Sequence, residues 1–189
     1  MKFILASKSP RRKEILEKIN LKFEIVPSNI DESVIEKQTP PKDYCIQLAV
    51  LKAQNVSNIY NKATVIGADT IVVINDNILN KPKNIRDAEN MLNMLSNNEH
   101  QVITGVSIEN KNLNISHSFY DISSVSFYKL SNKEIKKYID IYKPLDKSGS
   151  YGIQDGSAIF VKRIIGSYDN IMGFPVSKFY QFIKKIKLV

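Results

Sequence analysis

Acidic side chains are the residues in this chain best suited to hydrolytic chemistry, and Asp69 is the first of them. It stands inside an apolar, β-branched run at residues 65–74, VIGADTIVVI. An unpaired carboxylate is costly to bury there, so we interpret Asp69 as a metal ligand or general base, with a structural pairing to a lysine as the alternative. On the two-residue period of a strand, Asp69 shares a face with Gly67, which would leave space for a ligand, and Thr70 points the other way.

A second acidic group, Asp31 and Glu32, follows a short apolar run in a polar loop. With Asp69 these residues form the best set of oxygen ligands in the chain. Carboxylates without histidine or cysteine suit Mg²⁺ or Mn²⁺ bound together with substrate phosphates. A loop acid is usually only solvated, and for Glu32 that alternative stays open.

Two arginines mark a candidate phosphate site. Arg11 and Arg12, half of the four arginines in the chain, fall in the first turn of a helix that Ser9 caps and Pro10 begins. A cation in the first turn interacts unfavourably with the helix dipole. Each one destabilises the helix by about 0.3–1 kcal/mol unless an anion lies between them. Ser7 and Ser9 add hydroxyl donors. The turn therefore predicts a phosphate site, and a solvated basic helix start is the alternative.

Two lysines could meet either Asp69 or a phosphate. Lys52 falls on the apolar stripe of an expected helix, where a lysine either extends its ammonium to solvent or pairs with a group inside. Lys81 follows the hairpin that the strand of Asp69 begins. For each lysine a purely structural role is the alternative.

A glycine-bearing loop at residues 146–156, DKSGSYGIQDG, is a weaker candidate for base recognition. Its glycines would let the backbone approach a ligand, and Tyr151 could stack on a base. The amide of Gln154 offers one donor and one acceptor, which suits the imide edge of uracil or thymine.

Alternating strands and helices must position these residues. We expect one domain over residues 1–189, an α/β fold in which a mixed twisted sheet with flanking helices forms two lobes around a central cleft. Strands are expected at 2–6, 23–27, 63–74, 101–108, 114–128 and 158–165. Helices are expected from Ser9-Pro10 onward and at 42–60, 85–95, 134–142 and 175–187, with loops at 28–41, 144–156 and 166–173.

Composition excludes several classes of protein. Of 189 residues, 43% are hydrophobic and 24% charged, as in ordinary globular chains. One cysteine and two histidines exclude a disulfide framework and a zinc site rich in these ligands. No apolar run of about 18 residues occurs, so we expect a soluble, cytoplasmic protein without membrane contact. The net charge of +8 is either a lysine-rich compositional bias or an attraction for nucleotides or nucleic acid.

Taken in order, these segments resemble the Maf family of nucleoside triphosphate pyrophosphatases over nearly the whole chain. The matching segments are LASKSPRR at 5–12, IDE at 30–32, LAVLKA at 48–53, GADT at 67–70, KP at 81–82, TGV at 104–106, SGSYGIQ at 148–154, GSY at 166–168 and MGFP at 172–175. The chain departs from the family pattern at Asn80, where glycine is common.

The resemblance implies a fold of the Maf/ITPase-like type, a homodimer, and hydrolysis of a nucleoside triphosphate to the monophosphate and pyrophosphate with Mg²⁺ or Mn²⁺. Asp69 would accept the proton of the attacking water, and Glu32 would help Asp69 to hold the metal. The residues that would contact the phosphates are Ser7, Arg12, Lys52 and Lys81.

The family divides by substrate, and three positions here resemble the branch that acts on dTTP and UTP. These positions are Arg11, Thr70 and Gln154. The branch that acts on 7-methyl-GTP has Trp, Gln and Glu at the matching places. We therefore expect a dTTP/UTP pyrophosphatase without a stable nucleic-acid partner. The alternatives are a nucleotide-sensing regulator of cell division and a basic nucleic-acid-binding module without catalysis.

Overall fold

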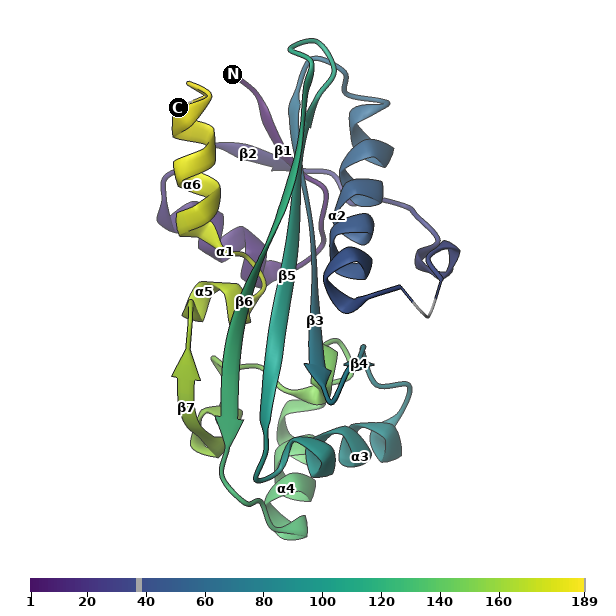
Figure 1. The fold of residues 1–189 in the computed structure, drawn as a ribbon, viewed down its shortest axis with the longest axis vertical. Coiled ribbons are helices and arrows are strands. Elements are labelled where there is room, and N and C mark those ends of the chain that lie inside the picture. The colour runs from purple at the N-terminus through teal and green to yellow at the C-terminus, as the bar shows by residue number, and fades with distance from the viewer. Residues whose placement is uncertain (37–38, 189) are drawn as a thin grey trace. The chain divides into compact units, whose positions relative to one another are not determined.

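A mixed β-sheet with flanking helices forms the framework of the chain in the computed structural model, which describes residues 1–36 and 39–188 (Figure 1). The strands are β1 (Phe3–Leu5), β2 (Phe23–Ile25), β3 (Thr64–Ile74), β4 (Asn77–Leu79), β5 (Glu99–Asn110), β6 (Ile115–Phe127) and β7 (Val161–Ile165). Their order is β2-β1-β3-β5-β6-β7, and β4 pairs with β3. The helices are α1 (Pro10–Lys18), α2 (Pro41–Ser57), α3 (Ile85–Leu95), α4 (Asn132–Tyr142), α5 (Tyr168–Met172) and α6 (Val176–Lys185). The expected mixed α/β class is confirmed.

The backbone divides into two compact units. Unit 1 consists of Met1–Thr70, Thr104–Asp121 and Gly173–Val189, and unit 2 consists of Ile71–Ile103 and Ile122–Met172. The strands β3, β5 and β6 contribute residues to both. Nowhere in the described chain does a helix have the length and apolar composition needed to cross a bilayer.

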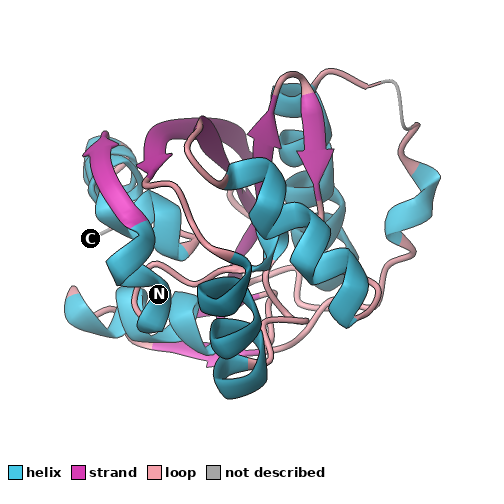
Figure 2. Cartoon of the chain, turned by 90° about the horizontal axis from the view of Figure 1, so that it is seen from below, coloured by secondary structure: helices cyan, strands magenta, loops and turns pink. Residues whose placement is uncertain are grey.

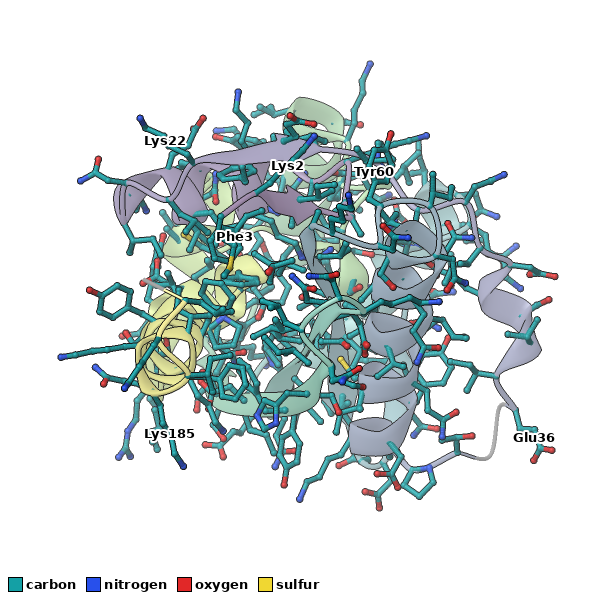
Figure 3. All side chains as sticks on the ribbon, turned by 90° about the horizontal axis from the view of Figure 1, so that it is seen from above. Lys2, Phe3, Lys22, Glu36, Tyr60 and Lys185 are labelled. Carbon is teal, nitrogen blue, oxygen red and sulfur yellow. The ribbon has the colours of Figure 1, made fainter. Side chains whose placement is uncertain are left out.

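In unit 1, the parallel strand β1 is buried, whereas its neighbour β2 is largely exposed. β1 pairs in parallel with both β2 and β3, and all three of its side chains are buried, as expected for a strand covered on both faces. The helices α2 and α6 lie on opposite sides of β1 and β3 (Figure 1). At the start of β1, the ammonium of Lys2 pairs with Glu24 at 2.9 Å and lies 5.8 Å from the centroid of the Tyr60 ring (Figure 3).

Two glycines let α2 lie directly against the sheet. A Cβ on Gly67 of β3 would overlap the carbonyl oxygen of Ala49 and lie 2.7 Å from the backbone nitrogen of Ala53. A Cβ on Gly105 of β5 would lie 2.6 Å from the carbonyl oxygen of Cys45. The interpretation that Gly67 leaves space for a ligand is therefore wrong, because the helix backbone fills that space.

Unit 2 contains two antiparallel pairings and the helices α3, α4 and α5. β4 pairs antiparallel with β3 through Asn75 and Asp76, whose φ angles of 47° and 61° are those of a tight hairpin turn. β7 pairs antiparallel with β6. The start of α4 carries a capping box, with Ser131 and Glu134 hydrogen-bonded reciprocally.

Four predicted segments differ from the structure. The predicted strand at 158–165 is only Val161–Ile165, because Gly156–Phe160 forms a 3₁₀ helix capped by the side chain of Asp155. The predicted loop at 166–173 contains α5. The helix predicted to Tyr60 ends at Ser57, and Ile59 is 73% exposed instead of buried. The predicted loop at 28–41 includes a 3₁₀ turn at Glu32–Val34, the short cyan turn at the right of Figure 2.

Candidate active site

The guanidinium of Arg12, a half-buried residue of unit 1, donates hydrogen bonds to three neutral oxygen atoms. Arg12 donates from Nε to the carbonyl oxygen of Gly173 at 2.9 Å, from Nη1 to Ser7 Oγ at 3.1 Å and from Nη2 to Thr70 Oγ1 at 3.0 Å. Within residues 1–36 and 39–188, no carboxylate lies within ion-pair distance of it. Two of its five N–H groups remain to be satisfied.

The start of α1 explains why Arg12 occupies this place. Ser9 is the N-cap, its Oγ accepts from the backbone nitrogen of Arg12, and Pro10 begins the helix. Ser7 Oγ accepts from both Ser9 N at 3.2 Å and the guanidinium, so the Ser7 proton is left to donate. Burial lowers the pKa of Arg12, and the charge of Asp69 opposes that effect. The result is an oriented cation beside a helix N-terminus, an arrangement that binds anions.

Thr70 extends this network to a residue to which the sequence assigned no role. Because Thr70 Oγ1 accepts from Arg12, its own proton is directed to Thr104 Oγ1 at 3.0 Å or to the carbonyl oxygen of Gly173 at 3.4 Å. Thr104, on β5, is fully buried. Only the pairing of β3 with β5 brings these two hydroxyls together, and no sequence pattern near Thr104 indicates it.

On the opposite face of β3, Asp69 is joined to α2 through a lysine. Lys52 Nζ lies 2.6 Å from Asp69 Oδ1 and 2.7 Å from Glu32 Oε1. The side chains of Lys52 and Asp69 are 12% and 13% exposed, whereas that of Glu32 is 51% exposed. Burial acts to lower the pKa of Lys52, but the charge and hydrogen bonds of its two carboxylate partners raise it above its ordinary value. The alternative considered for Lys52, pairing with a group inside, is confirmed.

Cys45 of α2 fixes the backbone next to Asp69. Its Sγ donates to the carbonyl oxygen of Asp69 at 3.2 Å and accepts from the backbone nitrogen of Gly105 at 3.0 Å. Burial raises the pKa of this thiol, so it stays protonated and serves as a hydrogen-bonding group.

Glu32 and Asp69 are the residues that could hold a divalent cation. They share the Lys52 ammonium, and no group of three or more His, Cys, Asp or Glu side chains gathers elsewhere in the described residues. One or two carboxylates together with substrate phosphates are the usual Mg²⁺ ligands, so this pair fits such a cation if a phosphate supplies further oxygens. Asp31 has a different role, because its Oδ1 accepts from Ser33 N at 2.9 Å and caps the 3₁₀ turn. Hydrogen bonding from the side chain and the backbone of Ser33 lowers the pKa of Asp31.

Three further predicted site residues are Arg11 of α1 and, in unit 2, Lys81 and Gln154. Arg11 is half-buried in α1, and its charge contributes to lowering the pKa of Arg12. Lys81 and Gln154 are exposed residues of unit 2. The carbonyl oxygen of Asn80, next to Lys81, accepts from Gly149 N at 3.3 Å. The roles of these residues in the site stay predictions.

The glycine-bearing loop of unit 2 differs from its interpretation. Tyr151 is 5% exposed, its hydroxyl lies 2.8 Å from Nε2 of His100, and its ring packs edge-on against Phe127. The interpretation that Tyr151 stacks on a base is therefore wrong. Gly149, with φ of 67°, lies against Val72, so this glycine serves the internal packing of the loop.

Comparison with known proteins shows the family of this chain. A family model described as Maf-like protein matches residues 2–186. A dTTP/UTP pyrophosphatase from Geobacillus sp. (strain WCH70) is 47% identical over 184 residues, covering 97% of each chain. A dTTP/UTP pyrophosphatase from Clostridioides difficile (strain 630) is 45% identical over 185 residues, covering 98% of this chain and 95% of its own. A solved structure of the Staphylococcus aureus Ham1 protein has a TM-score of 0.48 and 17% identity, covering 67% of this chain and 72% of that one.

Proposed function

Because this chain belongs to the Maf-like protein family, we propose that it is a nucleoside triphosphate pyrophosphatase that hydrolyses dTTP and UTP to the monophosphate and pyrophosphate. Two relatives with that name are 47% and 45% identical to it over nearly their whole length. One observation carries the proposal for the chemistry: Asp69 contacts a lysine on one face of β3, while the next residue, Thr70, contacts the half-buried guanidinium of Arg12 on the other face.

The first requirement of the reaction is to hold the triphosphate. Its negative oxygens repel a nucleophile, so donors fixed in advance lower the barrier. Arg12 offers two N–H groups, Ser7 offers a hydroxyl proton, and the N-terminus of α1 adds a positive partial charge. In the proposed complex, Lys81 and Lys52 add positive charge that attracts the triphosphate.

The second requirement is to activate water. Asp69 Oδ1 accepts from Lys52, whereas Oδ2 has no hydrogen-bond partner among the described residues. In the proposed step, Oδ2 takes a proton from water as the water oxygen bonds to the α-phosphorus. The bond from the α-phosphorus to the bridging oxygen breaks, and its electron pair leaves with pyrophosphate. Lys52 orients the Asp69 carboxylate throughout.

A divalent cation, Mg²⁺ or Mn²⁺, is part of the proposal. Glu32 and Asp69 would hold it together with phosphate oxygens. When bound, it would offset the charge of the triphosphate.

Location and assembly belong to the same proposal. The enzyme would act in the cytoplasm, where nucleoside triphosphates are made and used, and as a homodimer, as the family resemblance implies. Light scattering of the purified chain distinguishes the dimer from a monomer.

The experiment that tests this function is pyrophosphate release from dTTP, UTP, CTP, GTP and 7-methyl-GTP, each with Mg²⁺ or Mn²⁺. We expect fast release from dTTP and UTP and slow release from the other three. Equal release from all five would reject the substrate class. Tight nucleotide binding without release would favour a nucleotide-sensing protein instead.

A further inference from the structure

Gln154 lies on a turn of unit 2 whose backbone is held by hydrogen bonds to side chains beneath it. The turn runs from Gly152 to Asp155 and is closed by a hydrogen bond from Asp155 N to the carbonyl oxygen of Gly152 at 3.0 Å. Gln154 itself is exposed, and among the described residues no hydrogen bond occupies its side-chain amide. The turn therefore leaves this amide able to contact a ligand.

One buried hydroxyl from α4 contacts both ends of the turn. Tyr138 OH donates to the Asp155 carboxylate, with 3.1 Å to each oxygen, and accepts from Gly152 N at 3.2 Å. Tyr138 is 3% exposed. Burial and the charge of Asp155 raise the pKa of Tyr138, so the hydroxyl remains a donor at any working pH.

Further hydrogen bonds complete the support. Asp155 Oδ1 accepts from Ser157 N at 3.0 Å, and Ser157 Oγ donates to the carbonyl oxygen of Gly152 at 2.7 Å. Tyr168 OH donates to the carbonyl oxygen of Ile153, which precedes Gln154, at 3.4 Å. The backbone on both sides of Gln154 is thus bonded to side chains, of which Tyr138 and Ser157 are buried and Tyr168 is exposed.

A surface turn does not need such support, because water can satisfy its polar groups. A buried polar network is stable only when its members satisfy one another, and it then rigidifies the segment that it holds. We propose that Tyr138 and Asp155 are positioning residues that orient Gln154 for discrimination between pyrimidine bases. This inference rests on the proposed function, because it assigns to Gln154 the recognition of the base.

The chemistry of the amide explains why orientation matters. The imide edge of uracil or thymine presents an N–H donor beside a carbonyl acceptor, whereas cytosine presents a ring nitrogen acceptor beside an amino donor. A glutamine amide matches the first edge in one orientation and the second edge in the opposite one. A fixed turn would set the position from which the Gln154 amide reaches the base, and so which edge it can contact, whereas a mobile turn would let it meet either edge.

The test compares Tyr138→Phe, Asp155→Ala and the double variant, with kcat and KM measured for dTTP, UTP and CTP. We expect kcat for dTTP to change less than about twofold and the preference for dTTP and UTP over CTP, as kcat/KM, to fall about fivefold or more through KM. Because the two residues belong to one network, the double variant should lose no more preference than the more affected single variant.

A matched control is Tyr142→Phe, since the Tyr142 ring stacks on Tyr138 with a centroid separation of 5.1 Å. It loses a hydroxyl from the same helix and should keep the preference. Thermal unfolding of all variants identifies a merely structural role, which would lower the melting temperature and leave the preference unchanged. That result would overturn the proposal.

Gln154→Ala separates this inference from the proposed function. If Gln154→Ala loses the preference and Tyr138→Phe keeps it, the positioning role is wrong while the function stands. If Gln154→Ala also keeps the preference, the positioning role is wrong because Gln154 does not recognise the base. If the wild-type chain releases no pyrophosphate, the proposed function fails. The same preference is then measured from dissociation constants of dTTP, UTP and CTP, and a loss of preference in Tyr138→Phe and Asp155→Ala would still support the inference.

Discussion

The ammonium of Lys52 lies 2.6 Å from Oδ1 of Asp69 and joins the middle of α2 to the middle of β3. Both side chains are nearly buried, at 12% and 13% exposure. Removal of one member of such a pair leaves the other charge poorly solvated. The pair therefore orients the proposed proton acceptor and also makes the site sensitive to single substitutions.

Lys52→Met should reduce turnover of dTTP at least about 100-fold, because the triphosphate loses a cation and Asp69 loses its orienting partner. The same variant should bind Mn²⁺ more tightly than the wild type in the absence of nucleotide. The reason is that the ammonium that pairs with both Glu32 and Asp69 is gone, so these carboxylates no longer have a competing cation. Titration of Mn²⁺ followed by electron paramagnetic resonance measures this. Unchanged or weaker Mn²⁺ affinity would show that these carboxylates do not form the metal site.

Thr104→Val should raise KM for dTTP several-fold and reduce stability by about 1 kcal/mol, because Thr70 loses the hydroxyl 3.0 Å away. Thr104→Ser keeps the hydroxyl and should stay close to the wild type. Steady-state kinetics and urea unfolding of both variants check this. If valine and serine behave alike, the hydroxyl contact has no part in substrate binding.

Gly67→Ala should destabilise the chain by about 1–3 kcal/mol, because the new methyl group would force the backbone of α2 away from β3. Turnover should fall with stability, since Lys52 moves with α2. Thermal unfolding and kcat measured on the same samples test both statements. A stable, fully active variant would mean that α2 tolerates displacement without loss of the Lys52 contact.

Acid should destabilise unit 2 through His100. Burial lowers the pKa of His100 from 6.5 to about 4, so between these two pH values the unfolded chain binds more protons than the folded chain. Stability is therefore complete above about pH 6.5 and falls as pH decreases toward 4, by up to roughly 3 kcal/mol from this group. Urea unfolding at several pH values measures the loss, and His100→Gln should remove it. His117→Gln is the control, because His117 is largely exposed and should leave most of the loss in place.

The sequence was sufficient to predict residues whose roles depend on local structure. Ser7 and Arg12 lie together because a strand end, a capping serine and a proline determine where α1 begins. The opposite directions of Asp69 and Thr70 follow from the period of the strand, and both are observed.

Residues whose environment depends on distant segments could not be predicted in this way. Gly67 has the sequence properties of a ligand-facing glycine, but α2 fills its space. Tyr151 has an aromatic ring suited to stacking, but the partner of its hydroxyl is His100, 51 residues away. Cys45 and Thr104 contribute through the lateral arrangement of β3, β5 and α2, which no local pattern specifies.

The central claim is that Asp69 accepts the proton of the attacking water, and Asp69→Asn tests it most directly. The asparagine keeps the shape of the side chain but is a much weaker base. With dTTP and Mg²⁺, we expect pyrophosphate release to fall about 10²- to 10⁴-fold, while the dissociation constant for dTTP changes only a few-fold. Near-normal turnover in Asp69→Asn would contradict the account.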